Sequence, residues 1–457
     1  MLKKTALLFI TILILTSLTA QADEASLTKA IKSYKHKGTQ ISVAVHDARK
    51  GKELYTHNSH KALNPASTMK VITSVVALNT LGGWFKYETD FTTDAISKGT
   101  AYNLYVKGTG DPSFVEERLW RVAKELKVRG INNIEGNLII DNSLFNDFNF
   151  SGKEANSSRA YNAKLSPFAV NFNSFAVVAR NENGRVQAHV DPPTSHFKLK
   201  SNIKAKGHSL SVQRNFQQGI EHVQASGGVS KEKVKYANVS DPVQYAGTTF
   251  IWVLKQLDIN FKGKVRSGIA KGTKTIIKDK SKALSLILRD LNKYSNNFTA
   301  EMVLKTLAAH KLGAPGSTEK GTLLLKRFMK EQGLDNTEYA IYNGSGLSRN
   351  NRLSAHALNT ALMAAYQNTK IRSDLISSFS IAGTDGTLRS RLRDPRLKGN
   401  VKAKTGTLSD TTALSGYIEA KSGKMLAFTI LVNAPAAGSG KFYALQEKIL
   451  LDTYNSF

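Results

Sequence analysis

Apolar and polar positions near the N-terminal end of the chain follow the two regular periods of secondary structure. Residues 25–35 have the spacing of a helix, and residues 39–48 alternate as a strand does, with the apolar side chains on one face. A second helix is predicted to begin at Ser67 and to end at the glycine pair 82–83, because glycine commonly follows the last turn of a helix. We therefore expect helix and strand to pack together in this part of the chain.

The pattern changes after about residue 85. Up to about residue 260 the sequence consists of short β-like segments, and the clearest helix among them is residues 116–130. Longer helical patterns return from about residue 280, and the chain closes with three strand patterns and an amphipathic helix, at residues 402–410, 412–420, 424–433 and 440–457. This order predicts an α/β (α+β) fold, in which a domain of antiparallel sheet and helices is interrupted by a large β-rich insertion.

The first 22 residues have the pattern of a secretory signal peptide. Two lysines precede an apolar run from residue 6 to residue 18, and Ala20, Gln21 and Ala22 supply the small residues of a cleavage site. The alternative is an uncleaved membrane anchor, but the run is shorter than the about 20 apolar residues that span a bilayer comfortably. We therefore expect export by a cleaved signal peptide and a periplasmic location.

Composition narrows the classes of partner. The chain has no cysteine, which excludes disulfides and thiolate zinc sites. Its 64 basic and 35 acidic residues give a formal net charge of +29, which favours a polyanionic partner over a neutral one. No basic run is interleaved with aromatics, so we expect no nucleic acid but weak association with an acidic envelope polymer or anionic surface. The alternative is that the lysines serve solubility alone.

A serine and a lysine at the start of the second helix suggest a catalytic pair. Lys70 follows Ser67 by three positions, so its amine can reach the serine oxygen on the same helical face. The positive end of the helix dipole would favour an alkoxide there. The same Ser-x-x-Lys spacing also occurs at Ser26, Ser195, Ser201, Ser230 and Ser317, and a serine at this place is commonly only a helix cap. The pair alone therefore leaves both interpretations open.

Two later motifs favour the catalytic interpretation. Ser295 and Asn297 form a Ser-x-Asn motif where a coil meets a helix, and residues 404–406 form the single Lys-Thr-Gly of the chain, on a predicted strand. Ser-x-x-Lys, Ser-x-Asn and Lys-Thr-Gly in this order are the signature of penicillin-recognising serine acyl transferases. The order and the matching secondary structure predict one site.

Each member of the signature has a physical task in acyl transfer. Ser295 can pass a proton to the leaving amine, Asn297 can hold the substrate amide, and Lys404 can balance a terminal carboxylate. Thr405 continues the motif along the strand, and Gly406 allows a substrate backbone to lie close to it. The backbone N–H groups of Ser67 and Thr407 are expected to form the oxyanion hole.

The chain resembles a narrower group, the low-molecular-mass class C penicillin-binding proteins of the penicillin-binding protein 4 type, similar to peptidase family S13. Ser67 and Ser295 are 228 positions apart, a separation much longer than in simple β-lactamases. Further stretches match that group in order, at residues 108–114, 131–141, 190–194, 343–351 and 382–391. The resemblance covers nearly the whole chain after the signal peptide.

The resemblance implies a domain plan and an activity. It implies a β-lactamase-like or transpeptidase-like catalytic domain at residues 23–84 and 262–457, split by an inserted β-rich region of two nested domains at residues 85–261. It also implies a serine-type D-Ala-D-Ala carboxypeptidase and DD-endopeptidase that acts on peptidoglycan stem peptides. Ser67 would form the acyl-enzyme with Lys70 as base, and penicillins and other β-lactams would acylate Ser67 and leave slowly. Arg349 matches the arginine that in relatives helps to hold the carboxylate of the diaminopimelate side chain; the alternative is a surface arginine.

Two departures from the group concern the substrate rather than the reaction. Asn343 stands where many relatives have aspartate. In the inserted region, relatives commonly carry an aspartate shortly before an aromatic residue, and this aspartate receives the amine of the substrate side chain. Tyr161 matches the aromatic residue, but Asn156 stands near the place of the aspartate, and Glu154 is the alternative acid.

Other enzyme classes are less consistent with the sequence. A metallopeptidase is disfavoured, because the ten histidines are scattered, His57 and His60 are the only close pair, and no His-Glu-x-x-His occurs, so we expect no metal and no cofactor. Composition permits a Ser-His-Asp hydrolase, but there is no Gly-x-Ser-x-Gly. The serious rival is a non-catalytic peptidoglycan-binding protein that kept the fold, against which the presence of all five catalytic side chains argues. A β-lactamase is the other alternative, against which the long insertion argues.

Overall fold

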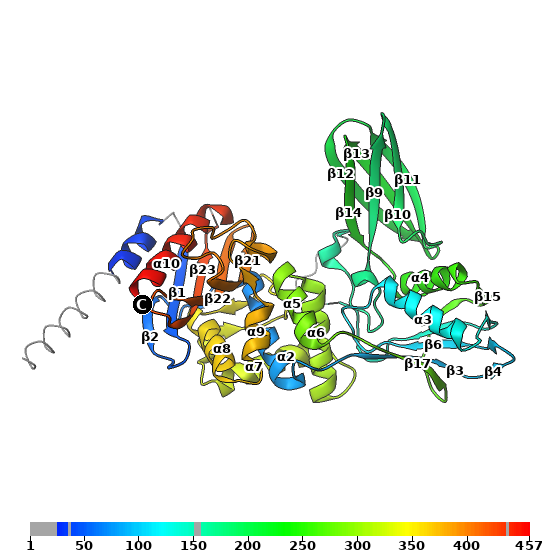
Figure 1. Cartoon of the computed structure of the whole chain (residues 1–457), viewed down its shortest axis with the longest axis horizontal. Coiled ribbons are helices and arrows are strands. Elements are labelled where there is room, and N and C mark those ends of the chain that lie inside the picture. Colours follow the sequence, from blue (N-terminus) through cyan, green and yellow to red (C-terminus); the bar gives the residue numbers. More distant parts are fainter. Residues whose placement is uncertain (1–24, 35–37, 150–156, 436–437) are drawn as a thin grey trace, which may run out of the picture. The chain divides into compact units, whose positions relative to one another are not determined.

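The computed structural model describes residues 25–34, 38–149, 157–435 and 438–457 (Figure 1). These residues form two compact units. The first unit comprises the chain up to Gly83 together with Leu288–Ser295 and Thr322–Phe457, and the second unit comprises Trp84–Ile287 and Asn296–Gly321. The chain therefore passes to the second unit after Gly83, returns to the first for Leu288–Ser295, and enters the second once more for Asn296–Gly321 before it completes the first.

A six-stranded antiparallel sheet is the centre of the first unit. Its order is β2-β1-β23-β22-β21-β20. The predicted strands at 39–48, 402–410, 412–420 and 424–433 are present, with ends that differ by at most two residues. The strands are β1 (Gln40–Asp47), β2 (Glu53–His57), β20 (Ser380–Ile381), β21 (Val401–Leu408), β22 (Thr411–Glu419) and β23 (Met425–Asn433).

Helices cover both faces of this sheet (Figure 1). Side chains alternate along a strand, so neighbouring residues of β1 face opposite layers. Val43 and Val45 belong to a core with Leu445 and Ile449 of α10 (Tyr443–Ser456). On the other face, the His46 side chain contacts the Asn359 side chain of α8 (Ala355–Gln367). Helix α8 in turn packs against α2 (Met69–Leu81).

The second unit is rich in short strands, as its sequence predicts. A five-stranded sheet has the order β16-β8-β6-β3-β17, a four-stranded sheet has the order β15-β7-β5-β4, and two three-stranded sheets, β10-β9-β14 and β11-β13-β12, contact each other. Helices α3 (Glu116–Val128), α4 (Pro242–Gln256) and α6 (Asn297–Leu312) complete this unit. The strands are β3 (Glu88–Thr93), β4 (Ile96–Ser97), β5 (Thr100–Ala101), β6 (Leu104–Lys107), β7 (Asn133–Ile134), β8 (Leu138–Asp141), β9 (Ser174–Glu182), β10 (Arg185–Asp191), β11 (Phe197–Lys204), β12 (His208–Gln217), β13 (Ile220–Val229), β14 (Glu232–Asn238), β15 (Asn260–Phe261), β16 (Val265–Ser267) and β17 (Lys274–Lys280).

A charged cluster joins α3 to β17 within the second unit. Asp279 of β17 is buried and forms ion pairs with Arg118 and Arg121 of α3. Arg118 also pairs with the buried Asp111. Asp111 lies in one of the stretches that resemble the penicillin-binding protein group, and its carboxylate accepts hydrogen bonds from Ser113. This stretch therefore has a structural task in the second unit.

The ends of the predicted domains, at residues 84 and 262, stay a prediction. The predicted signal peptide lies outside the described residues, because the description begins at residue 25. Across the described ranges, none of the helices combines the length and the apolar character that a membrane span needs.

Candidate active site

Ser67 lies on a short turn that precedes helix α2. It is the middle residue of a 3-10 turn, η1 (Ala66–Thr68), and α2 begins at Met69, two residues later than the sequence predicts. Neither residue in the N-cap positions of these helices, Pro65 and Thr68, makes a side-chain capping bond. The hydroxyl of Ser67 instead accepts a hydrogen bond of 2.9 Å from Lys70 Nζ. Ser67 is therefore not the helix cap that the alternative interpretation requires.

The backbone before Ser67 is held in an unusual conformation. Ala66 has a φ of +45°, a region that L-residues adopt at a cost and that clusters at functional sites. Asn64 stabilises it, because its Oδ1 accepts the N–H of Ala66 at 2.9 Å and its own N–H donates to Asn433 of β23 at 2.8 Å. The Asn-Pro pair at 64–65 is a typical turn signal, but the sequence does not reveal that this turn carries the serine.

Lys70 is fully buried and contacts two partners at the site, Ser67 and Ser345. Besides Ser67, its ammonium donates to the backbone carbonyl of Ser345 at 2.5 Å. The Ser345 loop approaches closely because Gly346, with a φ of +81°, has no side chain: a Cβ there would lie 1.9 Å from the carbonyl oxygen of Ala66. Thr73 of α2 donates to the carbonyl of Gly344 at 2.7 Å and holds the same loop. No sequence pattern identifies the carbonyl of Ser345 as a partner of Lys70.

Strand β21 carries the Lys-Thr-Gly motif beside this turn. A Cβ on Gly406 would lie 2.8 Å from the carbonyl oxygen of Pro65, so glycine is needed here for η1 to pack against the strand. This reason differs from the predicted one, close approach of a substrate backbone. Thr407 is exposed, whereas Thr405 is buried and its hydroxyl donates to Thr387 at 2.8 Å.

A second serine–lysine pair lies beside the first. Lys404 Nζ donates to Ser295 Oγ at 2.9 Å and to the carbonyl of Thr405 at 2.7 Å, and its side chain is fully buried. Burial, together with the neighbouring Lys70 charge, holds the pKa of Lys404 well below the ordinary value of a lysine amine. Ser295 has a φ of +56°, so its backbone is strained as that of Ala66 is. The structure thus joins Ser67 with Lys70 and Ser295 with Lys404.

The segment at residues 380–388 supports the second pair. Lys293, two positions before Ser295, forms an ion pair with Asp385 and donates to the carbonyl of Phe379 at 3.0 Å. A Cβ on Gly386, whose φ is +52°, would lie 2.8 Å from the carbonyl oxygen of Lys293. Asp385 and Gly386 lie in the stretch at 382–391 that resembles the penicillin-binding protein group, so this stretch helps to hold the segment that carries Ser295.

The Asn343 loop is organised by amide hydrogen bonds. Asn343 is buried, and its Oδ1 accepts the N–H of Gly346 at 3.1 Å and the amide of Asn351 at 2.7 Å. An aspartate would offer the same acceptor oxygen, so the asparagine preserves these hydrogen bonds of the loop. Arg349 is half-exposed, forms an ion pair with Asp410 and donates to Ser409 at 2.9 Å. A substrate carboxylate would have to compete with Asp410 for it.

Asn297 and Tyr161 belong to the second unit. Asn297 is the first residue of α6, and the neighbouring Asn296 caps this helix by accepting the N–H of Thr299 at 3.0 Å. Tyr161 lies in the turn η2 (Ala160–Asn162), where the guanidinium of Arg159 lies over its ring. Asn156 and Glu154, the candidates for the side-chain amine pocket, lie outside the described residues.

The geometry suits acyl transfer. A serine hydroxyl hydrogen-bonded to a buried amine can lose its proton as it attacks a carbonyl, and a second hydroxyl bonded to a second amine can protonate a leaving group. Two buried amines repel each other's charge, which favours a neutral amine that can act as base.

Comparisons with known proteins identify the family of the chain. The D-Ala-D-Ala carboxypeptidase 3 (S13) family matches residues 24–448. A D-alanyl-D-alanine carboxypeptidase of Actinomadura sp. (strain R39) is 27% identical over 403 residues, which are 83% of this chain and 75% of the relative.

Solved structures of related proteins have the same fold. The crystal structure of penicillin binding protein 4 (dacB) from Haemophilus influenzae has a TM-score of 0.80 at 26% identity and covers 94% of this chain and 98% of that one. The same protein complexed with a novel β-lactam has a TM-score of 0.76 at 25% identity and covers 94% and 99%. The predicted fold class and the predicted resemblance are confirmed: the chain belongs to the D-Ala-D-Ala carboxypeptidase 3 (S13) family and is a serine-type D-Ala-D-Ala carboxypeptidase.

Proposed function

We propose that the chain cleaves the terminal peptide bond of peptidoglycan stem peptides through an acyl-enzyme on Ser67. The observation that carries this proposal is the 2.9 Å hydrogen bond from the buried Lys70 to a serine that does not cap its helix. A hydroxyl becomes a useful nucleophile only when a base lies within hydrogen-bond reach, and Lys70 fulfils this condition.

The steps follow from the two serine–lysine pairs. Neutral Lys70 takes the proton of Ser67 while Oγ attacks the carbonyl carbon of the penultimate D-alanine. The backbone N–H groups of Ser67 and Thr407 stabilise the resulting oxyanion. The C–N bond then breaks as Ser295 donates a proton to the leaving amine, and the proton that Lys70 took from Ser67 returns to Ser295 through Lys404. Water finally attacks the ester carbonyl, one of its protons restores the hydroxyl of Ser67, and the shortened peptide leaves with a new carboxyl group.

Other residues position the substrate. Asn297 holds the amide of the stem peptide, while Lys404 with Thr405 faces the terminal carboxylate and Arg349 the side-chain carboxylate. The same chemistry acts as a DD-endopeptidase when the leaving amine belongs to a cross-linked neighbouring stem rather than to free D-alanine. In a β-lactam the leaving amine stays tethered to the acyl group, so the acyl-enzyme persists; a related protein from Haemophilus influenzae has been solved with a β-lactam.

The substrate and the N-terminal pattern support an activity outside the cytoplasm. Peptidoglycan is an envelope polymer, and residues 1–22 have the pattern of a signal peptide. We therefore expect the enzyme to be periplasmic and its signal peptide to be cleaved.

Labelling with a fluorescent penicillin tests the proposal. Wild-type protein should form a stable covalent adduct, and Ser67→Ala should form none. Lys70→Met keeps the volume of the side chain and should slow labelling by about 10³-fold or more, because the base is lost. Ser201→Ala is the matched control, since Ser201 also has a lysine three positions later but lies exposed on β11, and it should be labelled as wild type is.

The outcomes separate the alternatives. Cleavage of a cross-linked muropeptide dimer by the wild type but not by Ser67→Ala would support the endopeptidase reaction. Rapid release of hydrolysed penicillin would indicate a β-lactamase. If folded wild-type protein takes up no label, the proposal is wrong, and peptidoglycan binding without catalysis becomes the better hypothesis.

A further inference from the structure

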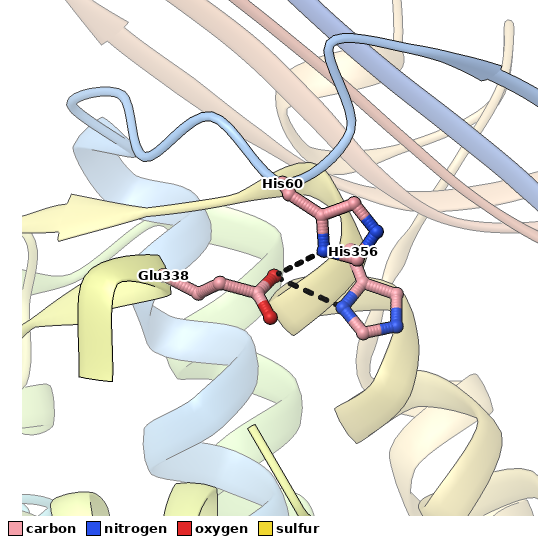
Figure 2. A group of neighbouring side chains, drawn as sticks. All are labelled: His60, Glu338 and His356. Atoms are coloured by element: carbon pink, nitrogen blue, oxygen red, sulfur yellow. Dashed lines mark hydrogen bonds and ion pairs between the residues drawn. The ribbon is translucent and has the colours of Figure 1, made fainter. Parts of the chain in front are cut away.

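Two histidines and a glutamate from three separate segments meet in the first unit (Figure 2). His60 lies in the loop between β2 and η1, Glu338 ends the short turn η4 (Asn336–Glu338), and His356 is in the first turn of α8. The Nδ1 atoms of His60 and His356 lie 3.2 Å and 2.9 Å from the same oxygen, Glu338 Oε2. One ligand atom from each residue lies within 4.8 Å of the others.

The carboxylate is buried while the cluster opens to solvent on one side. The side chain of Glu338 is 6% exposed, that of His356 is 28% exposed and that of His60 is 65% exposed. Glu338 accepts hydrogen bonds from Ser354 and His356, and His60 lies against the same carboxylate. The two imidazoles thus lie between a buried carboxylate and solvent.

This donor set matches a known kind of metal site. Zinc commonly takes two imidazole nitrogens and one carboxylate oxygen at about 2.0–2.2 Å and keeps a fourth tetrahedral position for water. Two ligands about 2.1 Å from a tetrahedral ion lie about 3.4 Å apart, and the observed nitrogen-to-oxygen separations of 3.2 Å and 2.9 Å are close to this value. On zinc binding the Nδ1 protons would move to Nε2 or to solvent, and small rotations of the imidazoles would replace the two Nδ1–Oε2 contacts by two zinc–nitrogen bonds.

The ligands are themselves held by neighbours, as metal ligands usually are. Ser354 Oγ donates to Glu338 Oε2 at 2.7 Å, and the N–H of His356 donates to the carbonyl of Ser59 at 3.0 Å. The rings of His60 and His356 lie 4.4 Å apart. A third histidine, His46, lies 6.3 Å from the His356 ring, but its Nδ1 contacts the amide of Asn359 at 3.0 Å, so it is not a ligand.

We propose that His60, Glu338 and His356 form a zinc-binding site outside the catalytic serine–lysine pairs. The ion joins the loop that leads to Ser67 with the start of α8. These segments already meet at Leu63 and Leu353, whose backbone groups exchange hydrogen bonds of 3.0 Å and 2.9 Å. Zinc binding therefore stabilises the approach to the nucleophile without taking part in acyl transfer. The structural alternative is that Glu338 only anchors the first turn of α8 through Ser354 and His356.

Zinc titration of the full chain, after dialysis against a chelator, distinguishes the two interpretations. Affinity is measured by competition with a chromophoric chelator, and ligand geometry by the visible absorption of the Co²⁺ form. We expect one Zn²⁺ per chain for the wild type. His60→Ala and Glu338→Gln should each weaken binding by about tenfold or more, because one of three ligands is lost. His189→Ala removes an exposed histidine of β10 in the second unit and should leave binding unchanged.

A second measurement keeps the test valid if Glu338→Gln folds poorly. His60 is largely exposed, so His60→Ala should have the circular dichroism spectrum and the metal-free melting temperature of the wild type. Added Zn²⁺ should raise the melting temperature of the wild type but not of His60→Ala, because a ligand that binds only the folded state stabilises it. Absence of zinc binding by the wild type, or equal affinity in the wild type and His60→Ala, would overturn the proposal. Equal loss in His189→Ala would also overturn it, as adventitious binding to surface histidines.

Discussion

At the scale of single residues, the chemistry depends on two lysines buried side by side. An ordinary lysine has a pKa near 10.4 and is a poor base at neutral pH. Lys404 is fully buried, and both burial and the Lys70 charge lower its pKa well below that value. Because like charges in a dry site resist joint protonation, the pair holds a neutral amine under conditions where a surface lysine would be charged. The two amines titrate as a coupled system.

This coupling predicts how Lys404 titrates. Burial and the Lys70 charge lower the pKa of Lys404, so its amine should lose its proton below the ordinary lysine value of about 10.4. Lys70→Met removes the neighbouring charge, and the titration of Lys404 should move to higher pH. Nitrogen-15 NMR of the lysine side chains from about pH 5 to pH 11 measures both titrations. A pKa of Lys404 that is the same in the wild type and in Lys70→Met would show that the lysines are not coupled.

At the scale of elements, buried ion pairs tie helices to sheets where apolar contacts alone would not fix their position. Asp279 of β17 accepts both Arg118 and Arg121 of α3, and its side chain is 2% exposed. Removing one partner from a buried pair leaves an uncompensated charge, which costs more than the pair itself contributes. The same helix carries an exposed pair, Arg129 with Glu125, which lies in water.

The buried and the exposed ion pair of α3 therefore predict different losses of stability when the acidic partner is removed. Asp279→Ala should lower the free energy of unfolding of the second unit by about 3–5 kcal/mol. Glu125→Ala, the matched control, should lower it by well under about 1 kcal/mol, because exposed ion pairs contribute little. Urea denaturation followed by the fluorescence of Trp120 and Trp252, whose rings are 5.8 Å apart in this unit, measures both. Similar losses in the two variants would contradict the assignment of Asp279 as the buried anchor.

At the scale of the whole molecule, the net charge of +29 favours attraction to polyanions. Exposed lysines are numerous on the two three-stranded sheets of the second unit and in the turns beside them. They include Lys198, Lys200, Lys204, Lys206, Lys231, Lys233 and Lys235. Few acidic side chains oppose them there, so this surface is suited to an anionic polymer or membrane.

Weak binding to an anionic surface is the expected outcome. Sedimentation with vesicles that contain phosphatidylglycerol should decrease strongly between about 50 mM and 500 mM salt, because screening shortens the range of surface charge. Replacing Lys198, Lys200, Lys233 and Lys235 by glutamate should weaken sedimentation. The same replacement at four exposed lysines of the first unit, Lys330, Lys370, Lys398 and Lys424, serves as the control. Binding that is independent of salt would contradict an electrostatic origin.

Patterns that are local along the chain were enough to predict much of this protein. Strand alternation at 39–48 and at the three C-terminal strands required only neighbouring residues, and these strands are present. The three motifs predicted the enzyme class, which the family match confirms, because the reaction requires these residue types in this order. The helix start at Ser67 was wrong by two residues, since the turn η1 is stabilised by distant partners such as Asn433.

Contacts between distant segments explain the geometry and the charge state of the site, which local sequence patterns do not predict. Such patterns carry no information about which distant residues touch. The positive φ of Ala66 is held by Asn64, whose backbone N–H donates to the distant Asn433. The lowered pKa of Lys404 depends on burial beside Lys70. The scattered histidines predicted no metal site, yet folding brings His60 and His356 to one glutamate. Local sequence therefore specified the elements and the reaction, whereas long-range packing specified the geometry and charge state of the site.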